Sequence, residues 1–139
     1  MAERREPARD SLGMLDTLTE HVEQSVTMVR EKRANLEKAR ATPGVLDDAT
    51  VARVKRVFGQ TAEDAEMFAE QGRQWAAEGI TPAQRDQVEC YAALVVELQR
   101  ETTAILALAD ELAKGATETV LTKSDIELGI ESFLRDDDL

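Results

Sequence analysis

The sequence predicts an all-α protein, an antiparallel up-down bundle of three long helices followed by one short C-terminal helix. Its 20 alanines and 4% aromatic residues favour a helical core of Ala, Leu and Val. Pro and Gly fall mainly where they divide the chain into segments of similar length, and apolar residues recur in alternating steps of three and four. With 139 residues, we expect residues 1–139 to form a single domain.

The first helix is predicted over residues 10–41. Asp10 or Ser11 can cap its opening turn, and Thr42-Pro43-Gly44 ends it. Residues 1–9 before it are expected to form a disordered tail. One face carries a clean apolar row of Leu15, Val22, Val29 and Leu36. The neighbouring row is polar in its middle, at Ser25 and Lys32, which indicates register setting or a neighbour that supplies acids.

The second helix is predicted over residues 47–78. Asp47 suits its N-terminus, and Gly79 can end it in the left-handed conformation. Its core row keeps a heptad register: Val51, Val54, Phe58, Thr61, Ala65, Phe68, Gly72 and Trp75. Ala62, Ala69 and Ala76 widen this stripe, so we expect the helix to face two neighbours.

The third helix is predicted over residues 81–114. Thr81 and Gln84 form a capping-box pattern with Pro82 at the first helical position, and Lys114-Gly115 ends the helix. Its heptad row is Val88, Tyr91, Val95, Leu98, Thr102, Ile105, Ala109 and Leu112. Residues 116–123 are rich in β-branched side chains and are predicted to be an extended connector.

The short fourth helix is predicted over residues 124–135, with Ser124 and Glu127 as its capping box. Residues 136–139 should fray, because Asp136, Asp137 and Asp138 oppose the helix dipole. One face gathers the four predicted partner-binding residues: Ile126, Ile130, Phe133 and Leu134. This face either docks into a groove on another protein or folds back over the open seam of its own bundle.

The charge and cysteine content exclude several function classes. A formal net charge of −11 argues against free nucleic acid as a partner, because phosphate binding needs a basic footprint. A single cysteine, Cys90, can form neither an internal disulfide nor a cysteine-rich zinc site. The sequence lacks an apolar run long enough to cross a membrane. We therefore expect a cytoplasmic protein that does not bind membranes.

Cations gather in residues 30–56, which carry eight basic and four acidic residues. In an antiparallel hairpin they share one end of the bundle, which we call the basic pole: Arg30, Lys32, Arg33, Lys38, Arg40, Arg53, Lys55 and Arg56. Helix dipoles account for the cations of the first helix, but not for those near the start of the second. An anionic ligand, an acidic partner, the acidic pole of another copy, or a solvated surface of mixed charge would each fit.

Catalytic motifs are missing from the sequence: it has neither a Gly-rich phosphate loop nor a nucleophile elbow. Carboxylates spaced at one helical turn offer one alternative, a small metal-dependent hydrolase holding Mg²⁺ through Glu20, Glu23, Glu63 and Glu66. We expect instead that the protein has no metal and no cofactor.

Residues 128–135 read Leu-Gly-Ile-Glu-Ser-Phe-Leu-Arg. This segment resembles the cargo-loading tails of encapsulin nanocompartments, which tend to read Leu-Gly-Ile-Gly-Ser-Leu. It lacks the second glycine of that pattern and inserts Phe133. The resemblance implies a cargo protein with a C-terminal targeting segment, which is a second alternative function.

The leading interpretation is a non-enzymatic, acidic interaction protein that acts as an adaptor, a chaperone-like holder of a helical client, or a structural subunit. A bundle of three long helices leaves an open groove, which the short fourth helix covers only in part. We therefore expect a protein partner or, more specifically, a second copy that makes a homo-oligomer.

Overall fold

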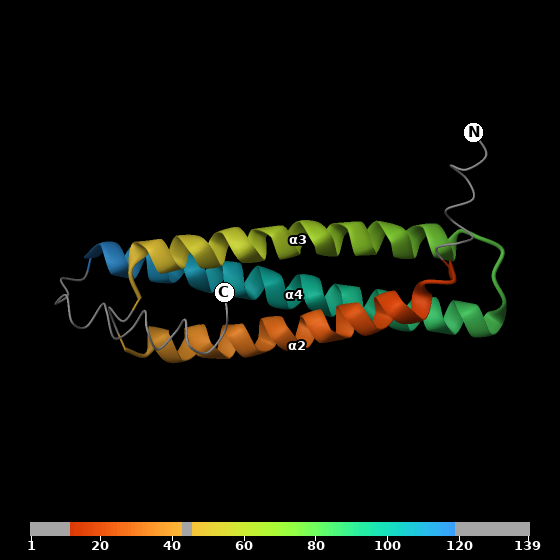
Figure 1. The fold of residues 1–139 in the computed structure, drawn as a ribbon, viewed down its shortest axis with the longest axis horizontal. Helices are drawn as coiled ribbons and strands as arrows, with labels where there is room; N and C mark the ends of the chain where they lie inside the picture. Colours follow the sequence, from red (N-terminus) through yellow and green to blue (C-terminus); the bar gives the residue numbers. More distant parts are fainter. Residues whose placement is uncertain (1–11, 43–45, 119–139) are drawn as a thin grey trace, which may run out of the picture.

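The computed structural model describes residues 12–42 and 46–118, and Figure 1 shows their fold. Within these ranges there are three long helices and no strand: α2 (Leu15–Arg40), α3 (Asp48–Ala76) and α4 (Pro82–Glu118). The prediction of an all-α fold with three long helices is therefore confirmed. The predicted helix over 124–135 and the predicted tails over 1–9 and 136–139 lie outside the described residues.

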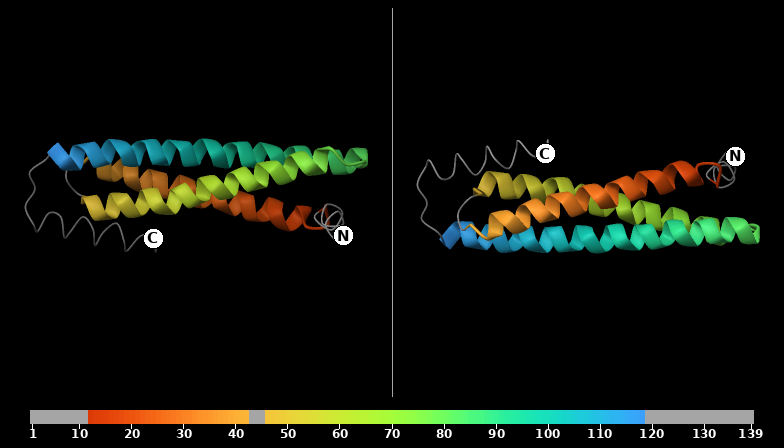
Figure 2. Two further views of the ribbon diagram at one scale, coloured as in Figure 1. Left: turned by 90° about the horizontal axis from the view of Figure 1, so that it is seen from above. Right: turned by 90° about the horizontal axis from the view of Figure 1, so that it is seen from below.

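Helix α4 is the common neighbour of the other two. It packs along both α2 and α3, which approach each other far less (Figures 1 and 2). Side-chain pairs Lys55–Asp110 and Glu66–Gln99 show that moving forward along α3 means moving back along α4. On α2, the pairs Arg30–Glu101 and Arg40–Glu111 advance together with α4. The three helices therefore run up, down and up.

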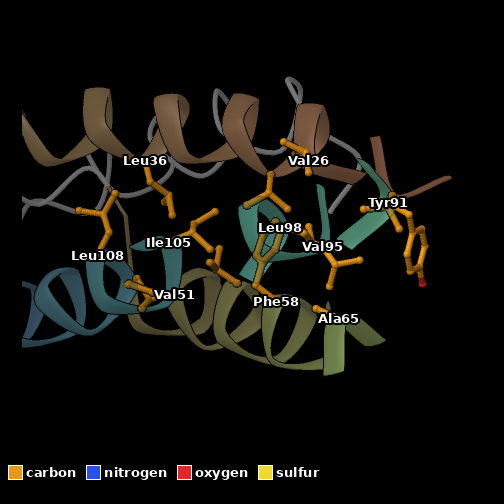
Figure 3. Close-up of a cluster of buried hydrophobic side chains, with 14 of the residues drawn as sticks. Val26, Leu36, Val51, Phe58, Ala65, Tyr91, Val95, Leu98, Ile105 and Leu108 are labelled. Carbon is orange, nitrogen blue, oxygen red and sulfur yellow. The ribbon is translucent and has the colours of Figure 1, made fainter. Parts of the chain in front are cut away.

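Most residues of the predicted heptad rows are buried in the core, whereas Thr61, Phe68 and Leu112 are half-buried. Tyr91, Val95, Leu98 and Ile105 of α4 are at most 1% exposed, and Figure 3 shows most of this cluster. The clean row of α2 is buried throughout, and Phe58 and Trp75 of α3 have no exposed surface. Burying apolar side chains of this size contributes about 1.5–3 kcal/mol each. Helices α2 and α3 are therefore both joined to the core by packing against α4.

Two predicted helix starts are confirmed by their hydrogen bonds. The Asp47 carboxylate accepts a hydrogen bond of 2.9 Å from the Thr50 amide, so it caps α3. At α4 the capping box is reciprocal: the Thr81 amide donates to Gln84 Oε1 at 2.9 Å, and the Gln84 amide donates to Thr81 Oγ1 at 3.1 Å. These local sequence patterns act as predicted because they satisfy amides that have no partner inside the helix.

Three predicted boundaries need correction. Helix α2 begins at Leu15 rather than near residue 10, and its N-cap Met14 offers no side-chain hydrogen bond. Gly79 does not take a left-handed conformation; α3 ends at Ala76, and the Ala77 amide bonds back to the Arg73 carbonyl at 3.1 Å. Helix α4 continues through Gly115 to Glu118, so residues 116–118 are helical and not part of an extended connector. A glycine lowers helix propensity by only about 1 kcal/mol, which a long packed helix tolerates.

No helix in the described ranges is long and apolar enough to cross a membrane. This agrees with what the sequence predicts for these segments.

Candidate functional site

Half of the predicted basic pole pairs with acids of α4. Arg33 Nη1 lies 2.9 Å from Glu101 Oε1, and Arg30 Nε lies 3.2 Å from Glu101 Oε2. Arg30 also pairs with Glu97. Two further pairs, Arg40–Glu111 and Lys55–Asp110, each measure 2.9 Å. Much of the positive charge that the sequence places at this end is therefore balanced inside the chain.

Glu101 is the most buried carboxylate of this group, with a side chain 12% exposed. Burial alone would raise the pKa of Glu101, but hydrogen bonds from Arg33 and Arg30 outweigh it and lower the pKa. The charged form of Glu101 therefore holds two α2 guanidinium groups against α4. This seam between α2 and α4 is closed by charged side chains.

The other cations of the pole are arranged differently. Lys38, Arg53 and Arg56 form no ion pair with any residue of the described ranges. Lys38 and Arg56 are exposed, whereas Arg53 is half-buried on α3. Lys32 is half-buried on α2. Lys32 of α2 and Arg53 of α3 are thus two half-buried cations of the basic pole.

The alternative metal site does not assemble in the described part of the chain. No three His, Cys, Asp or Glu side chains there lie close enough together to hold a metal ion. Glu20, Glu23 and Glu63 are exposed, and Glu66 instead accepts long hydrogen bonds of 3.5 Å from Arg73 and Gln99. The structure therefore does not bring the four predicted carboxylates together.

An apolar groove of about 310 Å³ lies between α3 and α4. Small residues of α3 form one wall: Ala69, Gly72 and Ala76. Apolar residues of α4 form the other: Val88, Ala92, Val95 and Val96. Because the α3 wall is made of alanine and glycine, another helix could approach its backbone closely. We call this feature the α3/α4 groove.

Tyr91 forms the floor of the α3/α4 groove and is fixed by three contacts. Its hydroxyl donates a hydrogen bond of 2.8 Å to the Phe68 carbonyl. Its ring meets Trp75 edge to face, with centroids 5.0 Å apart. A Cβ atom at Gly72 would lie 3.2 Å from Tyr91 Cε2, so glycine makes room for the ring. Burial raises the pKa of Tyr91 to about 12.

The rim of the α3/α4 groove combines one exposed apolar side chain with charges of both signs. Val96 is 49% exposed, and it is one of three large apolar residues exposed to this degree in the described ranges. On the α3 rim, Arg73 hydrogen-bonds to Glu70 at 2.7 Å. Glu89 stands on the α4 rim. The groove is apolar inside and charged at its edges, as a protein-binding surface often is.

The alanine stripe at 62, 69 and 76 predicted that the second helix faces two neighbours. In the described ranges α3 packs mainly on α4, and Ala69 and Ala76 of this stripe line the uncovered groove. Val96 and Glu89 were missed, because they lie beside the heptad row and carry no pattern of their own. Cys90 is exposed. The four predicted partner-binding residues, Ile126, Ile130, Phe133 and Leu134, lie outside the described residues.

Comparisons add no relative from which a function could be carried over. The chain matches no protein-family model, no curated protein and no solved structure. Function must therefore be inferred from the geometry of the groove and of the charged seams.

Proposed function

We propose that this chain is a non-enzymatic interaction protein that self-associates, and that a second copy of the chain occupies the α3/α4 groove. The observation that carries the proposal is the groove itself, which leaves apolar walls of two helices uncovered. An apolar hollow between two helices of a bundle is a common place for another molecule to bind. A cytoplasmic adaptor or structural subunit fits this arrangement and the single free cysteine.

A second copy is favoured because the groove face is complementary to itself. In a two-fold interface, helix α3 of one copy faces helix α4 of the other. The exposed Val96 of each copy then meets the small residues Ala69 and Ala76 of its partner. Arg73 on one rim likewise faces Glu89 on the opposite rim of the partner. One surface thus offers both a projection and a recess, and both a cation and an anion.

The seam between α2 and α4 is a less suitable surface for a second copy than the α3/α4 groove. It is bridged by Arg30, Arg33 and Arg40 with their α4 acids, so a partner there would have to displace charged pairs. Removing such charges from water is costly unless each regains a partner. A partner that binds in the α3/α4 groove would not have to displace charged pairs along the apolar walls of the groove.

The test compares the oligomeric state of two matched variants by sedimentation equilibrium. Val96→Glu places a charge at the groove, and we expect it to weaken self-association at least tenfold, about 1.4 kcal/mol. Met67→Glu is the control, because Met67 is 65% exposed on α3 and does not line the groove. Equal helicity of both variants by circular dichroism shows that folding is unaffected. A monomeric wild-type chain, or equal weakening by both substitutions, would contradict the proposal.

A further inference from the structure

We infer that residues 124–135 of this chain dock on the face of α2 and α3 that lies opposite α4, near the end of the bundle where α4 finishes. This surface differs from the α3/α4 groove, and docking there does not depend on self-association. It gives a role to the amphipathic segment and to the half-buried cations Lys32 and Arg53.

The docking surface is a row of half-buried residues along each of the two helices, which we call the α2/α3 seam. At one end His21 of α2 meets the Phe68 ring edge to face, with centroids 5.6 Å apart, so these sides of the helices face each other. Steps of three or four residues from this contact define the two rows. They are Ser25, Met28, Lys32, Asn35 and Ala39 on α2, and Asp64, Thr61, Val57 and Arg53 on α3. Asp64, the one acid of these rows, lies one turn from Phe68 and away from the start of α3.

These rows combine an apolar base with positive charge. Met28, Ala39 and Val57 are partly buried and pack against the core, but α2 and α3 approach each other much less than each approaches α4. Lys32 and Arg53 are half-buried on the same sides of their helices. The seam is therefore suited to an apolar helix face with acidic flanks.

The segment 124–135 has this composition. Residues 119–139 contain six acidic and two basic residues. Glu127 and Glu131 each directly follow an isoleucine of the apolar face, so they lie at its edge. The rim of the α3/α4 groove, in contrast, carries Glu89 as well as Arg73, and Arg73 is already paired with Glu70, so the rim offers an acidic segment no net positive charge. Charge complementarity thus favours the α2/α3 seam.

The length of the chain favours the same surface. The Lys55–Asp110 pair shows that the end of α4 lies level with the start of α3. Five residues, 119–123, separate Glu118 from the predicted helix and span up to ~16 Å. From Ile126 to Leu134 a helix rises ~12 Å, which matches the ~12 Å from Arg53 to Thr61. The nearest residue of the α3/α4 groove, Gln99, lies ~28 Å back along α4 from Glu118, beyond the reach of this connector.

This docking also accounts for the polar row of α2. Lys32 stands at a heptad position where an apolar residue is the norm, and the sequence indicated either register setting or a neighbour that supplies acids. In the docked segment, Glu127 and Glu131 would be the acids that such a neighbour supplies. The docked helix would run antiparallel to α4 and complete a four-helix bundle.

The test is disulfide trapping in the full chain with Cys90→Ser as background. Val57→Cys on the seam is combined in turn with Ile126→Cys and Ile130→Cys. The matched control pairs the same two tail cysteines with Ala92→Cys, which lines the α3/α4 groove. We expect at least one seam pair to form a disulfide within a single chain, several-fold faster than either control pair. Unchanged helicity by circular dichroism shows that each variant folds.

Three results would overturn the inference. They are bonds that form only between two chains, control pairs that react as fast as the seam pairs, and no bond in either seam pair. A charge exchange gives an independent readout. Glu127→Lys with Glu131→Lys should slow disulfide formation, and adding Lys32→Glu with Arg53→Glu should restore it. Failure of this rescue would also contradict the docking.

Discussion

The Tyr91 hydroxyl donates a hydrogen bond of 2.8 Å to the carbonyl oxygen of Phe68. This bond joins α4 to α3, and the Phe68 ring in turn contacts His21 of α2. Three helices therefore meet at one aromatic cluster, which also includes Trp75. Tyr91 is the one tyrosine of the chain, so its titration reports on this cluster alone.

The first prediction concerns the titration of Tyr91. We expect the absorbance change of tyrosinate to occur with a pKa of about 12, because burial disfavours the charged form. An unfolded tyrosine titrates near pH ~10, so the folded state binds more protons between these values. The free energy of unfolding should therefore be independent of this group below pH ~10 and fall as the pH rises towards ~12. A pKa near ~10 in the folded chain would contradict this expectation.

Tyr91→Phe is the matched variant. It keeps the ring but removes the hydroxyl, so it should cost about 1 kcal/mol in urea unfolding and abolish the fall in stability above pH ~10. If the free energy of unfolding of Tyr91→Phe still falls above pH ~10, the titration of another group causes this fall.

The second prediction compares two glycines within α3. A Cβ atom at Gly59 would have no other atom within 4 Å, so Gly59→Ala should stabilise the protein by about 0.5–1 kcal/mol through helix propensity. Gly72→Ala gains the same propensity, but its Cβ would press on Tyr91, whose ring is held by Phe68 and Trp75. We expect the propensity gain to be cancelled there. Equal stabilisation by both substitutions in thermal unfolding would show that Tyr91 moves freely.

The third prediction concerns Glu101 and acid. Because hydrogen bonds from Arg33 and Arg30 hold the pKa of Glu101 below its usual value, its contribution is present above pH 4.5 and is lost as the pH falls through the folded pKa. Glu101→Gln should lower stability at neutral pH by about 1 kcal/mol and weaken the acid dependence. The measurement is urea unfolding between about pH 3 and pH 7.

Glu111→Gln is the control for Glu101. Glu111 also pairs with an α2 arginine, but its side chain is 62% exposed, so solvent screens the pair. We expect little change in stability. If both variants lose the same stability and the same acid dependence, burial of Glu101 is not what distinguishes the two pairs.

The fourth prediction concerns the start of α4. Thr81→Ala removes the hydroxyl that accepts from the Gln84 amide and should destabilise the protein by about 1 kcal/mol. Thr81→Ser keeps an accepting hydroxyl and should be nearly neutral. A Thr81→Ala variant as stable as wild type in thermal unfolding would show that the cap is redundant.

Local sequence patterns predicted the structural features that depend on residues only a few positions apart. The heptad rows identified the core, and the caps at Asp47 and Thr81 are formed as expected. The glycine stop signals failed at Gly79 and Gly115, because a glycine permits a helix end without requiring one.

The sequence by itself determined that this protein forms three long helices and most of their buried positions, because helical periodicity and capping act over a few residues. Only the tertiary structure decided that α4 is the shared neighbour, that Arg30 and Arg33 are balanced by Glu101, and that the open apolar groove lies between α3 and α4. These features depend on which helices meet and in what register. Residues separated by about 70 positions are brought together by packing, which periodicity along one helix does not encode.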